Sequence, residues 1–266
     1  MSTILDKIIA AKRERIANAK RTANMPDLES RANENAKRPG RLAEALSTSG
    51  PAIIAEFKRA SPSKGVINDG LDPAAAAQAY EFGGAAAISV LTEEDFFSGS
   101  LADLETVVGT VAIPVLRKDF TIDEFQIIES AAVGASAILL IVAALEKAQL
   151  SDLRAAAEDF GLDAIVEVHD RDEMEVAIGS GASIIGVNNR NLKTFEVSLD
   201  VSRSLIGLRP EGVLMVAESG ISNAAEIAEL HALGFDAFLI GETLMRSGDP
   251  AGELKRLLGA TEKTGA

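Results

Sequence analysis

IIAEFKRASPSKG, residues 53–65, begins as an apolar run typical of a β-strand and ends in a loop rich in serine, proline and glycine. Side chains alternate along a strand, so Glu56 and Lys58 should share one face while Phe57 takes the other. Opposite charges on an otherwise buried strand are costly unless they are paired or used in chemistry. This segment alone fits either a buried ion pair or a functional site.

Seven more apolar runs follow, separated by segments of helical periodicity that mostly end at glycine, as helices often do. The eight predicted strands are 52–58, 85–92, 113–118, 136–142, 163–169, 183–188, 213–219 and 236–241. Near-continuous apolar strands that alternate with helices indicate parallel strands covered on both faces. Eight such units, without a G-x-G-x-x-G turn after an early strand, predict an α/β fold of the (β/α)8 TIM barrel type.

The first 50 residues precede the barrel and are expected to form an N-terminal helical extension of one domain spanning 1–266. MSTILDKIIAAKRERIANAKR, residues 1–21, is amphipathic. Its apolar residues at roughly helical spacing are Ile4, Leu5, Ile8, Ile9 and Ile16. The segment lacks the continuous apolar core of a signal peptide, and the chain has no long uncharged apolar stretch, so export and membrane spanning are disfavoured.

Composition narrows the classes of function. The formal net charge of −14, from 40 acidic and 26 basic residues, argues against a nucleic-acid partner or a basic membrane-surface protein. Cysteine is absent, which excludes disulfides, thiolate catalysis and cysteine metal sites, and suits a cytoplasmic protein. With two histidines, a histidine-rich metal site is not expected. A monomer is the default expectation.

Polar side chains occupy the C-terminal ends of most predicted strands, where barrels of this class carry their chemistry. They are Glu56, Lys58, Arg117, Lys118, Asp119, Glu167, Asn188, Asn189, Arg190, Glu218 and Glu242. One buried ion pair would not explain so many. Glu167 alternates with Val166 and Val168, so it should point into the barrel, where burial perturbs the pKa of a carboxyl group. His169 and His231 fit ordinary surface or core-edge positions.

Two loops suggest phosphate binding. Ser219-Gly220 and Gly241-Glu242 follow the seventh and eighth strands, where such barrels often bind phosphate through backbone N–H groups and a short helix. Glycine allows close approach of the backbone to an anion, although the same glycines would also suit tight turns. Because Ser61 is available in the first loop, a phosphate site is the favoured interpretation.

The sequence resembles the indole-3-glycerol phosphate synthase family over nearly its whole length. The resemblance lies in the N-terminal helix and in IIAEFKRASPSKG, ISVLTEEDFFSGS, PVLRKDF, ILLIVAAL, IVEVHD, IGVNNRNLKTFEV, ESGIS and LIGETLM, in the family's order. Ser136 and Ala217 depart from the usual acidic residue and serine, and neither is expected to take part in chemistry. Because the chain ends near the barrel, it is similar to the single-function form of the family, which is expected to lack a fused isomerase or amidotransferase domain.

The resemblance implies a carboxy-lyase that closes, decarboxylates and dehydrates 1-(2-carboxyphenylamino)-1-deoxyribulose 5-phosphate to indole-3-glycerol phosphate, without a metal or organic cofactor. It implies that Lys118 is the general acid for ring closure, that Lys58 contacts the substrate carboxylate and acts as an acid in dehydration, and that Glu167 is a base or electrostatic partner. Which lysine acts at which step stays open.

The resemblance also assigns supporting residues. Glu56 would orient the lysines, Asn188 would hold substrate hydroxyl or carboxylate groups, Arg190 would contact an anion or the scaffold, and Glu218 would be a further polar partner. The phosphate would be bound by Ser61, Ser219, Gly220, Gly241 and Glu242. The anthranilate ring would be flanked by Leu91, Phe97 and Phe120.

Two other functions fit a phosphate-binding barrel with strand-end lysines. One is a Schiff-base aldolase acting on a phosphorylated sugar, which would form an imine on Lys58 or Lys118. The other is a non-catalytic barrel that binds a phosphorylated metabolite, with the charged mouth used only for recognition. The residues by themselves indicate a phosphate-binding barrel enzyme with acid–base chemistry, and the resemblance favours the synthase.

Overall fold

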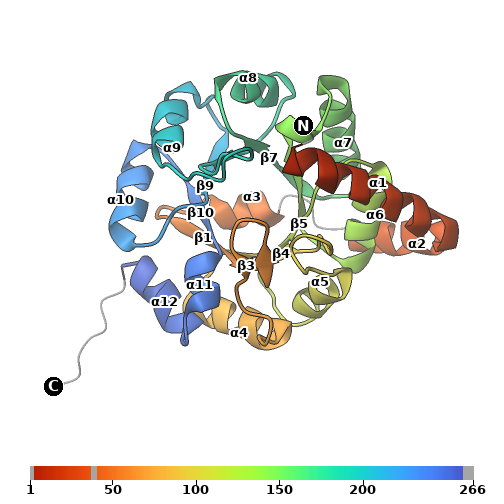
Figure 1. Cartoon of the computed structure of the whole chain (residues 1–266), viewed down its shortest axis with the longest axis horizontal. Coiled ribbons are helices and arrows are strands. Elements are labelled where there is room, and N and C mark those ends of the chain that lie inside the picture. Colours follow the sequence, from red (N-terminus) through yellow and green to blue (C-terminus); the bar gives the residue numbers. More distant parts are fainter. Residues whose placement is uncertain (1–2, 37–40, 260–266) are drawn as a thin grey trace.

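A computed structural model describes residues 3–36 and 41–259, and at its centre lies a closed barrel of eight parallel strands (Figure 1). The order around the barrel is β1-β10-β9-β8-β7-β6-β5-β4. The strands are β1 (Ala52–Phe57), β4 (Ala87–Leu91), β5 (Val115–Lys118), β6 (Ala137–Ile141), β7 (Asp163–Val168), β8 (Ile184–Asn188), β9 (Leu214–Glu218) and β10 (Ala237–Ile240). Each lies within its predicted range, so the predicted TIM barrel is confirmed.

Helices surround the strands on all sides in the view of Figure 1. They are α4 (Pro73–Gly83), α5 (Leu101–Val108), α6 (Glu124–Val133), α7 (Lys147–Asp159), α8 (Arg171–Gly179), α9 (Asp200–Leu205), α10 (Ala224–Leu233) and α12 (Pro250–Leu257), with the short α11 (Glu242–Arg246), η1 (Val142–Ala144) and η2 (Ile206–Leu208). Many begin at a side chain that accepts a hydrogen bond from the first turn, such as Asp72 for α4 and Asp170 for α8. Gly84 and Gly134 end α4 and α6 in the left-handed conformation, at φ 93° and 89°.

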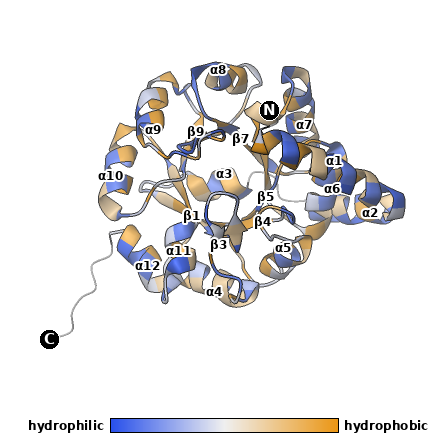
Figure 2. Cartoon of the chain, in the orientation of Figure 1, coloured by the Kyte–Doolittle hydropathy of each residue, from blue (hydrophilic) through white to orange (hydrophobic). Residues whose placement is uncertain are grey.

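Strand alternation divides the core into two layers. Ile165 of β7 packs with the residues that fill the barrel interior, whereas Val166 and Val168 pack against the surrounding helices. Glu167 shares the inward face with Ile165, as the sequence predicted. Figure 2 shows the same division, with apolar strands in the centre and hydrophilic residues on the outside of the helices.

Three helices precede the barrel, α1 (Ile4–Thr22), α2 (Met25–Asn35) and α3 (Arg41–Leu46), so the predicted N-terminal helical extension is present. Leu42 and Leu46 of α3 are fully buried against the interior residues of the barrel. The backbone N–H groups of Leu42 and Ala43 donate to Asp163 at the start of β7, at 2.8 and 3.1 Å. Since β7 starts at the N-terminal end of the barrel, α3 closes the end opposite the strand termini that carry the polar residues.

A small hairpin that the sequence did not predict stands in the loop after β1. It pairs β2 (Ala60–Ser61) with β3 (Gly65–Val66) in antiparallel fashion and lies in front of the strands in Figure 1. Two-residue strands are too short to leave a periodic pattern in a sequence. Within the described part of the chain, no helix combines the length and apolar character needed to cross a membrane.

Candidate active site

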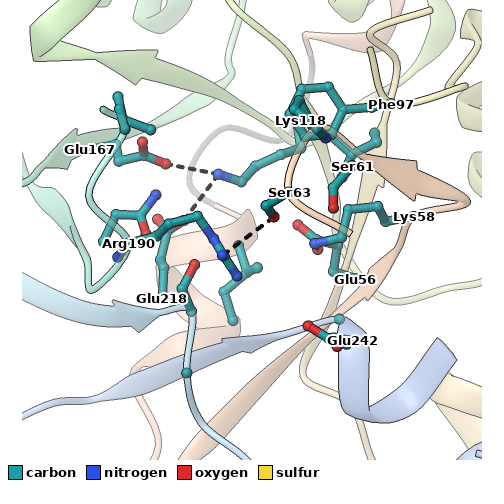
Figure 3. A pocket seen from close by; sticks show the side chains of 18 of the residues that line it. Glu56, Lys58, Ser61, Ser63, Phe97, Lys118, Glu167, Arg190, Glu218 and Glu242 are labelled. Carbon is teal, nitrogen blue, oxygen red and sulfur yellow. Dashed lines mark hydrogen bonds and ion pairs between the residues drawn. The ribbon is translucent and has the colours of Figure 1, made fainter. Parts of the chain in front are cut away.

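The C-terminal ends of the strands surround a cavity of about 400 Å³ (Figure 3). Of the strand-end polar residues that the sequence singled out, Arg117 and Asn189 do not line it. Its lining does include every residue to which the resemblance gave a role: Glu56, Lys58, Ser61, Leu91, Phe97, Lys118, Phe120, Glu167, Asn188, Arg190, Glu218, Ser219, Gly220, Gly241 and Glu242. These residues come from β1, β4, β5, β7, β8, β9 and β10 and the loops that follow them. The closed parallel barrel brings them together because every one of these strands ends at the same rim.

Lys118, the last residue of β5, lies between two carboxylates. Its Nζ donates to Glu167 Oε2 at 2.8 Å and to Glu218 Oε2 at 3.0 Å (Figure 3). Burial alone would lower the pKa of this lysine, but the charges of Glu167, Glu218 and Glu56 outweigh it and raise the pKa above its ordinary value. Lys118 is therefore an ammonium group, with protons to donate into the cavity.

Glu167 and Glu218 have pKa values shifted in opposite directions. Burial favours the neutral form of each, but Lys118 and His169 reverse this for Glu167 and lower its pKa. For Glu218, burial together with the neighbouring Glu167 charge prevails over Lys118 and raises the pKa. Two carboxyl groups pushed apart in this way suit different acid–base roles.

Glu218 has room to reach Lys118 because residue 186, on the neighbouring β8, is glycine. A Cβ at Gly186 would lie 2.3 Å from Glu218 Oε1 and 3.0 Å from Ile165 Cγ2. The φ of Gly186 is not positive, so the backbone itself would accept another residue. Position 186 therefore requires glycine because the Glu218 carboxylate occupies the space that a side chain would take.

Glu56 and Lys58 form the second charged pair, at the end of β1. Lys58 Nζ donates to Glu56 Oε1, and Glu56 is 3% exposed. Glu56 lies over Gly241, where a Cβ would approach its Oε1 to 2.3 Å. The buried ion pair considered from the sequence is present, and it forms part of the cavity wall.

Loops at one side of the cavity supply backbone groups and cations. Ser219 and Gly220 follow β9 with positive φ values of 65° and 83°, and α11 begins directly after Gly241. Arg190 Nη1 lies 3.4 Å from Ser63 Oγ and joins the loop after β8 to the loop after β1 (Figure 3). An anion would meet backbone N–H groups and a guanidinium here.

The opposite side of the cavity is apolar. The rings of Phe97 and Phe120 have centroids 6.1 Å apart, and Leu91 lines the same cavity. Ile4, Leu5 and Ile8 of α1 also line it, which the sequence did not predict. Their helical spacing indicated a buried face but not the surface that covers it.

Lys12 connects α1 to the strand end that carries Lys118. Its side chain is 5% exposed, and Nζ lies 2.9 Å from Asp119 Oδ1. Asp119 also accepts from Thr92 Oγ1 at 2.7 Å and pairs with Arg117 at 3.2 Å. Asp119 therefore joins the end of β5 to α1 and is itself paired with Arg117, while Lys118 between these two residues lines the cavity.

Neither histidine was predicted to take part in the site. His231 is half-buried on α10 and bonds to the carbonyl of Phe235 at 2.9 Å. His169, by contrast, has Nε2 3.3 Å from Glu167 Oε1, so it adjoins the central carboxylate. In the described ranges, no group of three or more His, Asp or Glu side chains could hold a metal ion.

Comparison with known proteins places this geometry in context. A family model described as indole-3-glycerol phosphate synthase matches residues 5–257. Proteins with that name from the Burkholderia ambifaria strains AMMD and MC40-6 are 46% and 45% identical over 259 residues, covering 97% of this chain and 99% of each relative. The structure of 3-hexulose-6-phosphate synthase from Salmonella typhimurium superposes with a TM-score of 0.65 at 14% identity, covering 79% of this chain and 97% of that one, which shows the fold alone.

Proposed function

Because the chain belongs to the indole-3-glycerol phosphate synthase family, we propose that the cavity at the mouth of the barrel is its active site. The enzyme acts on a phosphorylated small molecule in tryptophan biosynthesis, converting 1-(2-carboxyphenylamino)-1-deoxyribulose 5-phosphate to indole-3-glycerol phosphate with loss of CO2 and water. The observation that carries the proposal is Lys118, an ammonium group held by two carboxylates inside a cavity with one apolar and one anion-binding side.

The shape of the cavity fits the two ends of the substrate. The anthranilate ring would lie against Leu91, Phe97 and Phe120. The phosphate would be bound by Ser61, Ser219, Gly220, Gly241 and Glu242, the last three mainly through backbone N–H groups. The ribulose carbons would then cross the middle of the cavity, within reach of the charged side chains.

Ring closure needs an acid, because attack by the ring carbon on the ketone leaves charge on the carbonyl oxygen. Lys118 would donate a proton to that oxygen, and its raised pKa keeps it charged before the reaction. Lys58 would contact the substrate carboxylate, with Glu56 orienting its ammonium group. Loss of CO2 from the ring carbon that made the attack then restores the aromatic ring.

Dehydration completes the indole. Lys58 would protonate the leaving hydroxyl, and Glu167 would accept the proton lost from the adjacent carbon, for which its lowered pKa keeps it ionised. Asn188 would hold hydroxyl or carboxylate groups, Arg190 would contact an anion, and Glu218 would support Lys118. In total the substrate loses one CO2 and one water.

The test is product fluorescence in Lys118→Met. The chain has no Trp and one Tyr, so indole emission rises over little background. We expect kcat to fall by about 10²–10⁴-fold, because a positioned acid contributes roughly that factor. Lys147→Met, the same change at an exposed position on α7, should keep full activity. Near-normal turnover by a folded Lys118→Met protein would remove Lys118 from the mechanism.

We also propose that residues 1–266 act as a single domain and as a monomer. Residues of α1 and of the barrel line the same cavity, which supports a single domain, and the monomer is the default expectation from the sequence. Light scattering during size exclusion, at the concentrations used for the assay, tests this. A dimer that loses activity on dilution would overturn it.

A further inference from the structure

His169 lies between two carboxylates at the end of β7. Its Nε2 is 3.3 Å from Glu167 Oε1, and its Nδ1 is 2.9 Å from Glu173 Oε2 on α8. The side chain is 12% exposed. Nε2 is not aligned for a hydrogen bond and has no other partner in the described part of the chain, so the charge of Glu167 is what it faces.

Glu173 fixes the orientation of the ring. The same Oε2 that meets Nδ1 also accepts the backbone N–H of His169 at 2.8 Å. The backbone N–H of Glu173 in turn donates to Asp170, the N-cap of α8, at 2.9 Å. Both ring nitrogens thus face carboxylate oxygens, which accept hydrogen bonds but cannot donate them when ionised. A doubly protonated imidazole would donate from Nδ1 to Glu173 and place its positive charge beside Glu167.

The surroundings of the ring favour its charged form. Burial lowers the pKa of His169, but Glu167 and Glu173 outweigh it and raise the pKa to about 10. η1, which packs against β7 and α8, has the sequence VAA and brings no charge. The charged groups next to the His169–Glu167 pair, besides Glu173, are Lys118 from β5, which binds Glu167, and Glu218 from β9, which binds Lys118.

The two oxygens of Glu167 face two different cations. Oε2 accepts from Lys118 at 2.8 Å, and Oε1 faces His169. Lys118 is shared with Glu218, and it must turn toward the substrate to deliver a proton. When Lys118 turns away, Glu167 loses part of the interaction with the lysine ammonium group that keeps its carboxylate ionised. His169 is tied to Glu173 and does not depend on the substrate.

We propose that His169 is a positioning residue, held by Glu173, that keeps Glu167 ionised and directed into the cavity while Lys118 acts on the substrate. The inference rests on the proposed role of Glu167 as the base. It gives the reaction a second, permanent cation next to that carboxylate, supplied by a side chain outside the cavity lining.

The first test measures the charge interaction without turnover. His231→Asn leaves His169 as the one imidazole in the chain, so its ring ¹⁵N and ¹H signals can be followed against pH without overlap. We expect His169 to titrate at least about one pH unit above ordinary histidine, and Glu167→Gln to lower that pKa by about one unit. Titration at the ordinary value, or no response to Glu167→Gln, would overturn the proposal.

The second test is kinetic. His169→Asn keeps an amide donor but removes the positive charge, so the pKa of Glu167 should rise. The acid limb of the plot of kcat against pH should then move to higher pH by about one unit. At pH values below that limb, kcat should be about tenfold lower than in wild type. KM should stay nearly constant, and His231→Asn should match wild type. An unmoved acid limb in His169→Asn would refute the role. If Glu167→Gln itself retains activity, the proposed function fails instead, and the NMR result still decides whether the two groups interact.

Discussion

Gly186→Ala should disable the enzyme by displacing Glu218, although the substitution adds one methyl group to a strand. The new Cβ would lie 2.3 Å from Glu218 Oε1 and 3.3 Å from its Cδ, so the carboxylate must move by about 1 Å to reach an ordinary contact. That movement breaks or lengthens the 3.0 Å hydrogen bond to Lys118. Hydrogen bonds to charged groups contribute about 1.5–3 kcal/mol, so kcat should fall by roughly 10- to 100-fold.

The assay is indole fluorescence at saturating substrate, with thermal melting to follow stability. Crowding of the barrel interior should cost about 1–3 kcal/mol in the free energy of unfolding. Gly207→Ala is the matched control, because a Cβ there meets nothing within 4 Å. That control should keep full activity and unchanged or slightly higher stability.

A double substitution separates the displacement of Glu218 from general distortion of the barrel. In a Glu218→Ala background the carboxylate no longer occupies the space above Gly186, so adding Gly186→Ala should lower kcat little further. If Gly186→Ala lowers kcat by the same factor with and without Glu218, it acts through Ile165 or the backbone, and the reasoning is refuted.

Glu167→Gln should lower kcat far more than it raises KM, because the amide keeps the shape of the side chain but cannot accept the proton. Steady-state kinetics with fluorescence detection measures both constants. An effect confined to KM would make Glu167 a binding residue. Lys12→Met should destabilise the protein by about 3–5 kcal/mol, because it leaves Asp119 buried without one of its cations. Amide hydrogen exchange in α1 should be faster in this variant. It should be unchanged in the control Lys7→Met, because Lys7 is exposed on the same helix. Equal protection of α1 in both variants would show that the Lys12–Asp119 pair does not hold the helix.

The barrel and the charged site were predictable because both depend on local pattern. Each apolar run is long enough to identify a strand, and parallel connection through helices leaves one topology in which eight strands close. Once the strands are parallel, their C-terminal ends share a rim, so the residues after each run must lie together. Lys118 and Glu218, a hundred residues apart, meet for this reason.

The contribution of α1 was not predictable in the same way. Its apolar face was visible in the sequence, but an amphipathic pattern does not identify the surface on which the helix packs. Lys12 pairs with the buried Asp119, more than a hundred residues away, and this pair holds α1 where Ile8 lines the cavity. His169 was missed for a related reason. A single histidine after a strand is ordinary, and its proximity to Glu167 and Glu173 depends on side-chain directions at the junction of β7 and α8.

Gly186 and Gly241 explain how a filled barrel makes room for two buried carboxylates. A barrel interior is normally packed with apolar side chains in layers, and a carboxylate in the top layer needs space that a neighbouring strand must leave open. Gly186 leaves that space for Glu218, and Gly241 leaves it for Glu56. Both carboxylates then hold lysines in place, Glu218 with Lys118 and Glu56 with Lys58. Carboxylates therefore position both lysines, and the charges of Glu167, Glu218 and Glu56 favour the protonated form of Lys118 until a substrate with its own anionic ends competes for it.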